Sequence, residues 1–194
     1  MLRYDDRGEL QRVEDSQGRK LYFEYYPNGR LASVRGPGTV VRYAYDAVGN
    51  LELAAASDGS ARRYAYTDAR HPHHLTGISV GNVRLRAYGK RSTYERIASW
   101  AYDEQGRAIY SSHPVDAGKV SLEFNEGYTD VIDAFGRKTR YITGWRGGVA
   151  YVSEVRGPGC GVCGTGDARY RYDDLLRLVE YSRVNDPTLR YTYD

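Results

Sequence analysis

Short runs in which apolar and polar residues alternate fill this chain, and they predict β-strands. Residues 43–45 read Tyr-Ala-Tyr and residues 50–53 read Asn-Leu-Glu-Leu, the period of two expected of strands with one buried face. Residues 46–49, Asp-Ala-Val-Gly, predict a tight turn, because Asp bonds nearby backbone groups and Gly accepts a positive φ. A second turn signal, Ser-Asp-Gly-Ser, follows at residues 57–60. The predicted unit is therefore a β-hairpin, and the predicted fold class is all-β, built of repeated antiparallel hairpins.

The hairpin unit recurs along the chain about every 20 residues, as from Tyr4 to Tyr25 and from Tyr25 to Tyr45. A tyrosine, usually followed by aspartate, opens each turn, and a glycine usually lies four residues after the tyrosine. A period of this kind is typical of a repeat architecture, in which each unit buries its face only against its neighbours. The predicted structural repeat positions are Tyr4, Asp5, Gly8, Tyr25, Gly29, Tyr45, Asp46, Gly49, Tyr102, Asp103, Gly106, Tyr172 and Asp173.

A second aromatic residue usually precedes the repeat tyrosine by two positions. A spacing of two places both rings on one face of one strand. Hairpins side by side then predict a ladder of aromatic side chains across the sheet, with tyrosine, present in 20 copies, supplying much of the buried area. These aromatic residues are Phe23, Tyr43, Tyr64, Trp100, Tyr170 and Tyr191.

Two stretches interrupt the repeat period, at about residues 67–99 and 111–169. We expect irregular insertions there, as longer hairpins or surface loops, with one degenerate copy of the motif at residues 132–137. Residues 1–194 are interpreted as a single repeat array and as a fragment of a longer protein, because the sequence suggests no capping repeat. The sequence begins inside a repeat and has no signal-peptide pattern.

Charge and hydrophobicity argue against two classes of partner. The net charge is +3, and 24 of the 28 basic residues are arginines scattered along the chain. A nucleic-acid-binding surface would concentrate them in a stripe, so no nucleic acid is expected. Dispersed arginines predict stacking on tyrosine rings and pairing with Asp and Glu. No apolar run is long enough for a transmembrane helix, so no membrane span is expected.

Cys160-x-x-Cys163 is the sharpest candidate for site chemistry. It is compatible with a disulfide across a glycine-rich loop, with half of a zinc site, or with a redox pair. Tetrahedral zinc needs four ligands, and a thioredoxin-like pair needs a βαβ context that the sequence lacks. We favour a structural loop and keep Cys160 and Cys163 as the metal candidates.

Other motifs predict no chemistry. His71 and His73 could reach one metal, but Pro72 between them favours a loop. The glycines of residues 159–164 match G-x-G-x-x-G, yet a strand pattern follows where a dinucleotide site needs a helix. Adjacent aspartates, as at residues 173–174, point to opposite faces of a strand and form no catalytic pair. We predict no cofactor and no enzymatic activity.

Residues 4–10, 45–51 and 102–107 resemble the RHS or YD repeat, whose consensus is Y-D-x-x-G-x-L. Residues 66–78 and 157–164 resemble further segments common in bacterial RHS proteins. The resemblance covers essentially the whole chain.

The resemblance implies a structural function. RHS repeats of bacterial polymorphic toxins, insecticidal toxin complexes and teneurins form a long sheet that spirals into a hollow shell. In bacteria this shell encloses a C-terminal toxin, often until delivery by a type VI secretion system. The implied partners are neighbouring repeats and an encapsulated toxin domain, and the implied location is secreted or on the cell surface. Self-association through exposed sheet edges is also expected.

An alternative function is a cell-surface glycan-binding repeat module. Residues 25–29, Tyr-Tyr-Pro-Asn-Gly, are similar to choline-binding and cell-wall-binding repeats, which also use aromatic hairpins. Those repeats usually place paired tryptophans around the ligand, whereas Trp100 and Trp145 lie far apart in this sequence.

Overall fold

The computed structural model describes residues 1–83, 94–114, 118–160 and 164–194, and in these residues the regular structure is entirely strand apart from turns. The strands, with their bounds, are β1 (Leu2–Tyr4), β2 (Leu10–Glu14), β3 (Lys20–Tyr25), β4 (Leu31–Gly36), β5 (Thr39–Tyr45), β6 (Leu51–Ala56), β7 (Ser60–Ala65), β8 (Gly77–Asn82), β9 (Tyr94–Tyr102), β10 (Ala108–Ser112), β11 (Val120–Asn125), β12 (Tyr128–Asp133), β13 (Lys138–Arg146), β14 (Val149–Arg156), β15 (Gly159–Cys160), β16 (Gly164–Thr165), β17 (Ala168–Tyr172), β18 (Leu178–Arg183) and β19 (Leu189–Arg190).

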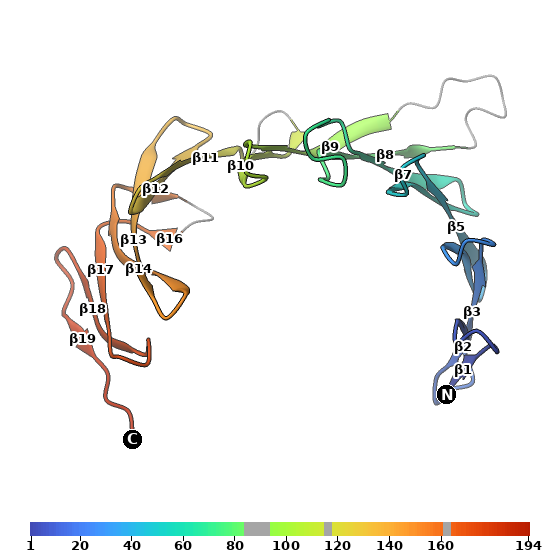
Figure 1. Cartoon of the computed structure of the whole chain (residues 1–194), viewed down its shortest axis with the longest axis horizontal. Coiled ribbons are helices and arrows are strands. Elements are labelled where there is room, and N and C mark those ends of the chain that lie inside the picture. Colours follow the sequence, from blue (N-terminus) through green and yellow to red (C-terminus); the bar gives the residue numbers. More distant parts are fainter. Residues whose placement is uncertain (84–93, 115–117, 161–163) are drawn as a thin grey trace. The chain divides into compact units, whose positions relative to one another are not determined.

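The chain divides into two compact units, Met1–Ser99 and Trp100–Asp194, with the boundary inside β9. In the first unit each strand from β1 to β9 pairs antiparallel with the next. In the second unit β10 to β14 pair in sequence, and β14 then pairs with β17, β17 with β18, and β18 with β19. Figure 1 shows that the main strands of each unit form one layer, in which successive strands turn progressively. The predicted all-β class, with curved sheets of hairpins, is confirmed.

The stretches that the sequence marks as irregular insertions contain regular strands. Residues 120–133 form a two-strand hairpin in unbroken register, from Val120 opposite Asp133 to Asn125 opposite Tyr128. This hairpin forms without a tyrosine-aspartate motif because alternating apolar residues on both sides of the short turn at residues 126–127 are sufficient. Among the described residues, the strand-free segments of these two stretches include residues 67–76.

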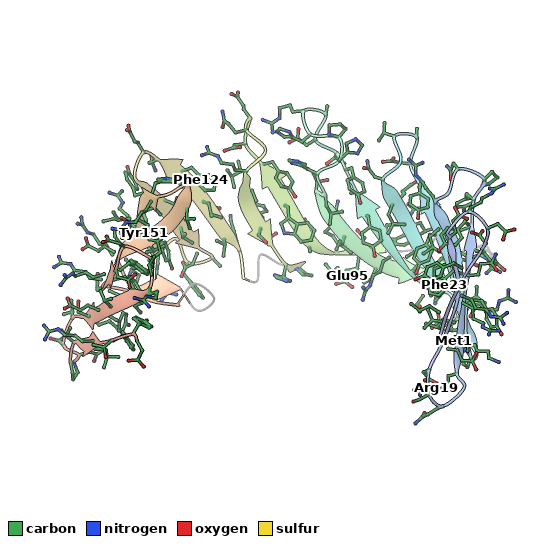
Figure 2. All side chains as sticks on the ribbon, turned by 60° about the horizontal axis from the view of Figure 1, so that its bottom comes forward. Met1, Arg19, Phe23, Glu95, Phe124 and Tyr151 are labelled. Atoms are coloured by element: carbon green, nitrogen blue, oxygen red, sulfur yellow. The ribbon has the colours of Figure 1, made fainter. Side chains whose placement is uncertain are left out.

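Alternation gives each unit two chemically different faces, whose side chains Figure 2 shows on both sides of the ribbon. In the second unit one face carries cross-strand ion pairs, such as Glu154 with Arg169 at 3.3 Å and Glu180 with Arg190 at 3.1 Å. The other face is apolar and aromatic, as where the rings of Tyr170 and Tyr181 lie 5.3 Å apart. The predicted pairing of arginine with acidic residues is therefore confirmed.

Asp130 is the most deeply buried member of the charged face. Its side chain accepts hydrogen bonds from Arg140 at 2.7 and 2.9 Å and from Lys138 at 3.2 Å, and the residue is only 2% exposed. Arg140 also lies 3.9 Å from the centre of the Tyr128 ring, which confirms the predicted stacking of arginine on tyrosine. The Arg140 hydrogen bonds, with Lys138 beside them, hold the pKa of the Asp130 carboxyl below its usual value.

The buried apolar core is small because each unit is one layer thick. Ala61, Val131, Val155 and Ala168 are its buried hydrophobic residues among those described. Gly157 passes so close to β13 that an added Cβ would lie 2.6 Å from the Lys138 carbonyl oxygen. A glycine is required there, since its φ of +109° adds to the lack of space.

Candidate functional site

The tyrosine-aspartate turns share one hydrogen-bonded geometry, seen clearly at Asp46. Its carboxylate oxygen Oδ1 accepts from the backbone N–H of Val48 at 3.1 Å and of Asn50 at 2.8 Å. Its own N–H donates to the Asn50 carbonyl at 2.9 Å, and the Gly49 N–H donates back to the Asp46 carbonyl at 3.1 Å. The aspartate therefore anchors both ends of the turn, as an Asx-type turn requires. The same pair of carboxylate bonds occurs at Asp5, Asp15, Asp103, Asp133 and Asp173.

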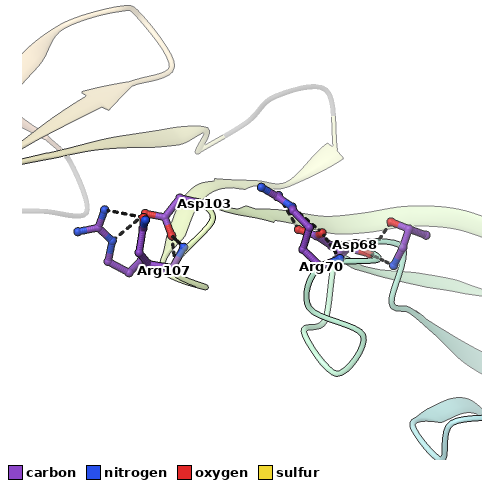
Figure 3. Close-up of polar contacts among 7 residues, drawn as sticks. Asp68, Arg70, Asp103 and Arg107 are labelled. Carbon is purple, nitrogen blue, oxygen red and sulfur yellow. Dashed lines mark hydrogen bonds and ion pairs between the residues drawn. The ribbon is translucent and has the colours of Figure 1, made fainter.

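An arginine four residues after the aspartate reinforces most of these turns. Figure 3 shows the contact between Arg107 and Asp103, in which Nε donates to Oδ2 at 2.7 Å. In the equivalent turn the Arg137 guanidinium holds the pKa of the Asp133 carboxyl below its usual value. At Asp46 the arginine is replaced by Asn50, whose amide donates to Oδ2 at 2.9 Å. Apart from the turn at Asp5, where Glu9 takes this place, these turns thus use both carboxylate oxygens of one aspartate.

The repeat tyrosine connects one repeat to the one before it. The Tyr25 hydroxyl donates to the Leu10 carbonyl at 2.9 Å, and the Tyr45 hydroxyl donates to the Leu31 carbonyl at 3.0 Å. Tyr193 makes the same bond, at 2.7 Å, to a leucine six residues after the preceding repeat tyrosine. We call this contact the tyrosine lock. It gives a backbone acceptor of one repeat a donor from the next, so adjacent hairpins are held in register.

The leucine that accepts each lock hydrogen bond lies opposite a β-bulge. The strand register shifts immediately before Tyr4, Tyr25, Tyr45 and Tyr172, where the partner strand carries one extra residue. A bulge bends its strand and increases the local twist. Recurrence at the same repeat position therefore accounts for the progressive turning of the strands within each unit.

The predicted repeat glycines lie in the left-handed region that the turn requires. Gly8, Gly29, Gly49 and Gly106 all have φ between 78° and 96°. In the fifth copy Leu176 takes this place with a φ of 58°, a strained conformation for a branched side chain. The second copy has a different departure, because Tyr26 stands where the others have aspartate and its turn keeps only the backbone bonds and a 3.1 Å bond from the Arg30 N–H to Asn28.

Asp15 builds the same anchored turn as the tyrosine-aspartate copies, although no tyrosine precedes it. Residues 15–18, Asp-Ser-Gln-Gly, predict a turn from the sequence alone, and Arg19, four residues after the aspartate, was the missed sign that its geometry is the same. The tyrosine lock had no local signal, because its partners lie 14 or 15 residues apart.

The histidine loop at residues 67–76 lies on the turn of the preceding repeat. Asn50 donates to the Pro72 carbonyl at 2.8 Å, and its side-chain oxygen lies 2.6 Å from Nδ1 of His73. The rings of His71 and His74 stack 4.6 Å apart. His71 and His73 therefore contact different partners. Nearby, Arg70 pairs with Asp68 at 2.8 Å, as Figure 3 shows.

No group of three or more potential metal ligands comes together within the described residues. The prediction for Cys160 and Cys163 lies outside them, because residues 161–163 are not described. The described part of the chain also has no helix long and apolar enough to cross a membrane.

Replacing Leu176 with glycine should stabilise the protein by about 1 kcal/mol, because glycine adopts the left-handed backbone of this turn without strain. Urea unfolding measures the change. The reciprocal substitution, Gly8→Ala, should destabilise by a similar amount, since its φ is +80° and no other group lies within 4 Å of the added methyl. Equal midpoints for Leu176→Gly and the wild type would contradict the assigned turn geometry.

Removing one lock hydroxyl with Tyr45→Phe should destabilise the protein by about 1 kcal/mol, because the Leu31 carbonyl loses its hydrogen-bond donor. The matched control is Tyr4→Phe, since the Tyr4 hydroxyl makes no hydrogen bond in the described part of the chain. Unfolding midpoints that fall equally for both variants would show that the lock contributes nothing specific.

Comparison with known proteins agrees with this architecture. Residues 25–63 match the family described as RHS Repeat. The Toxin protein Tse5 of Pseudomonas aeruginosa is 28% identical over 179 residues, which cover 91% of this chain and 12% of that protein. The crystal structure of TcdB2-TccC3 superposes with a TM-score of 0.62 at 16% identity, over 93% of this chain and 10% of that one. The chain thus spans only a small part of the proteins that it matches. The family match thus places an RHS repeat at residues 25–63, and the same turn geometry recurs in both units of the chain.

Proposed function

We propose that this chain is a structural, non-catalytic segment in the wall of a hollow β-shell, and that the shell belongs to an exported bacterial toxin protein. Residues 1–194 form one repeat array of that longer protein, and the shell encloses its C-terminal toxin domain. The parent protein is then secreted, by type VI secretion, or exposed at the cell surface. The similarity to Toxin protein Tse5 and the fold shared with TcdB2-TccC3 support this proposal.

The observation that carries the proposal is the tyrosine lock. Each lock hydrogen bond joins consecutive repeats, and each unit is a single layer with few buried residues. A repeat of this kind gains stability from its neighbours and offers broad, continuous faces in place of a compact core. A wall needs these properties.

Limited proteolysis of the full-length parent protein tests the enclosure. We expect the region C-terminal to the repeats to resist cleavage while this segment is intact. The double substitution Tyr25→Phe with Tyr45→Phe should accelerate cleavage of that region, because two consecutive locks are lost. Tyr4→Phe serves as the control. Cleavage of the C-terminal region at one rate in all three proteins would argue against enclosure by this segment.

Exposed strands at the sheet edges should let isolated copies of the chain associate. β1 pairs with β2 alone among the described strands, and Leu2, Arg3 and Tyr4 are all exposed. Unpaired N–H and C=O groups on such a strand accept a further strand by β-augmentation. Light scattering over a concentration series should show a mass that rises with concentration. A constant monomer mass would exclude this association.

A further inference from the structure

An open groove of about 570 Å³ lies on the apolar face of the first unit. Its walls include Tyr43 on β5 and Tyr64 on β7, and its lining between them includes Ala54 and Ala56 of β6. Since the two tyrosines stand on strands two apart in one sheet, about 10 Å of sheet separates them. That spacing leaves room for one planar ring between the tyrosine side chains.

The groove exists because position 54 carries an unusually small residue for its place in the repeat. Ala54 lies directly opposite Tyr43, the aromatic residue two positions before the repeat tyrosine. In four other repeats the residue in the corresponding position is larger. These residues are Val13, Val34, Ile78 and Tyr181.

The second unit indicates what fits the space. Tyr181 occupies the position of Ala54 there, and its ring packs 5.3 Å from the ring of Tyr170, the counterpart of Tyr43. The fold therefore accommodates an aromatic ring of the chain's own at this position. In the first unit Ala54 occupies this position, and the space that a larger side chain would fill is open to solvent.

An arginine that has no partner in the described part of the chain borders the groove. Arg62 lies opposite Ala54 on β7 and is exposed. Within the described residues its guanidinium makes no hydrogen bond or ion pair. On the charged face of the second unit, by contrast, Arg140 pairs with Asp130 and Arg169 pairs with Glu154. A free guanidinium beside an apolar groove favours a ligand that carries a carboxylate next to an apolar group.

We propose that this groove is a docking site for a partner polypeptide that inserts one aromatic side chain between Tyr43 and Tyr64. An acidic residue adjacent to that aromatic residue pairs with Arg62. Aromatic side chains gain most from such a site because they bury a large apolar area with few rotatable bonds. The inference goes beyond the role of the chain in a shell wall, because it requires only the folded segment.

The test measures binding of a short fluorescein-labelled peptide, with one tryptophan between two glutamates, to the whole chain by fluorescence anisotropy. We expect saturable binding that weakens at least about tenfold in Ala54→Tyr, which fills the groove with the residue found at position 181. Arg62→Gln should weaken binding less and reduce its dependence on salt. Val13→Tyr, at the corresponding position of another repeat and outside the groove lining, should leave the affinity unchanged.

Circular dichroism establishes that each variant is folded. If Ala54→Tyr does not fold, Ala54→Val replaces it, since valine occupies the same position in two other repeats, and it should also weaken binding. A wild-type chain that does not bind the peptide, or one that binds a tryptophan-to-alanine peptide equally well, overturns the proposal. A cell-wall oligosaccharide that binds in calorimetry, and loses binding in the Ala54 variant while the peptide does not bind, would assign the groove to a glycan instead.

Discussion

The constraint on which the rest of this structure depends is that each unit is one layer thick. A sheet with no second layer has little interior, and the chain accordingly buries few apolar side chains such as Val155 and Ala168. Stability must then come from the backbone ladder, from cross-strand side-chain pairs and from the turns that hold the ladder in register. The anchored aspartate turns serve this need, because each fixes two backbone donors with one carboxylate oxygen.

The tyrosine lock solves a second problem of a single layer, which is how a local turn can determine the position of the next hairpin. Asp46 organises its own turn, whereas Tyr45 reaches back to Leu31 of the preceding repeat. The two residues are adjacent in the motif but act at different ranges. Their adjacency couples the closing of a turn to the docking of that turn on its neighbour. The bulge at the same position adds the bend, so pairing, register and curvature all arise within a few residues.

The sequence predicted the hairpins well because their signals are local. The spacing of Asp46 and Gly49 is enough to place a turn, and alternation around it is enough to place two strands. The predicted family and fold class followed from the recurrence of that pattern. The sequence predicted less where a contact depends on residues far apart, as in the lock from Tyr25 to Leu10. Between residues 111 and 169, where the motif is lost, the sequence predicted longer hairpins or surface loops without choosing between them, and residues 120–133 form a hairpin.

Departures from the repeat are where the segment acquires individual properties. An uninterrupted repeat yields uniform faces, and uniform faces recognise nothing in particular. Leu176 in place of glycine stores strain, and the loop at residues 67–76 covers one turn through Asn50. Ala54 opens a groove that larger residues close elsewhere. These departures leave the backbone hydrogen-bond ladder intact, because backbone bonds and anchored turns fix the strand register independently of the side chains on the apolar face. A repeat held together in this way can vary that face freely, and a binding site can evolve on it without loss of the strand ladder.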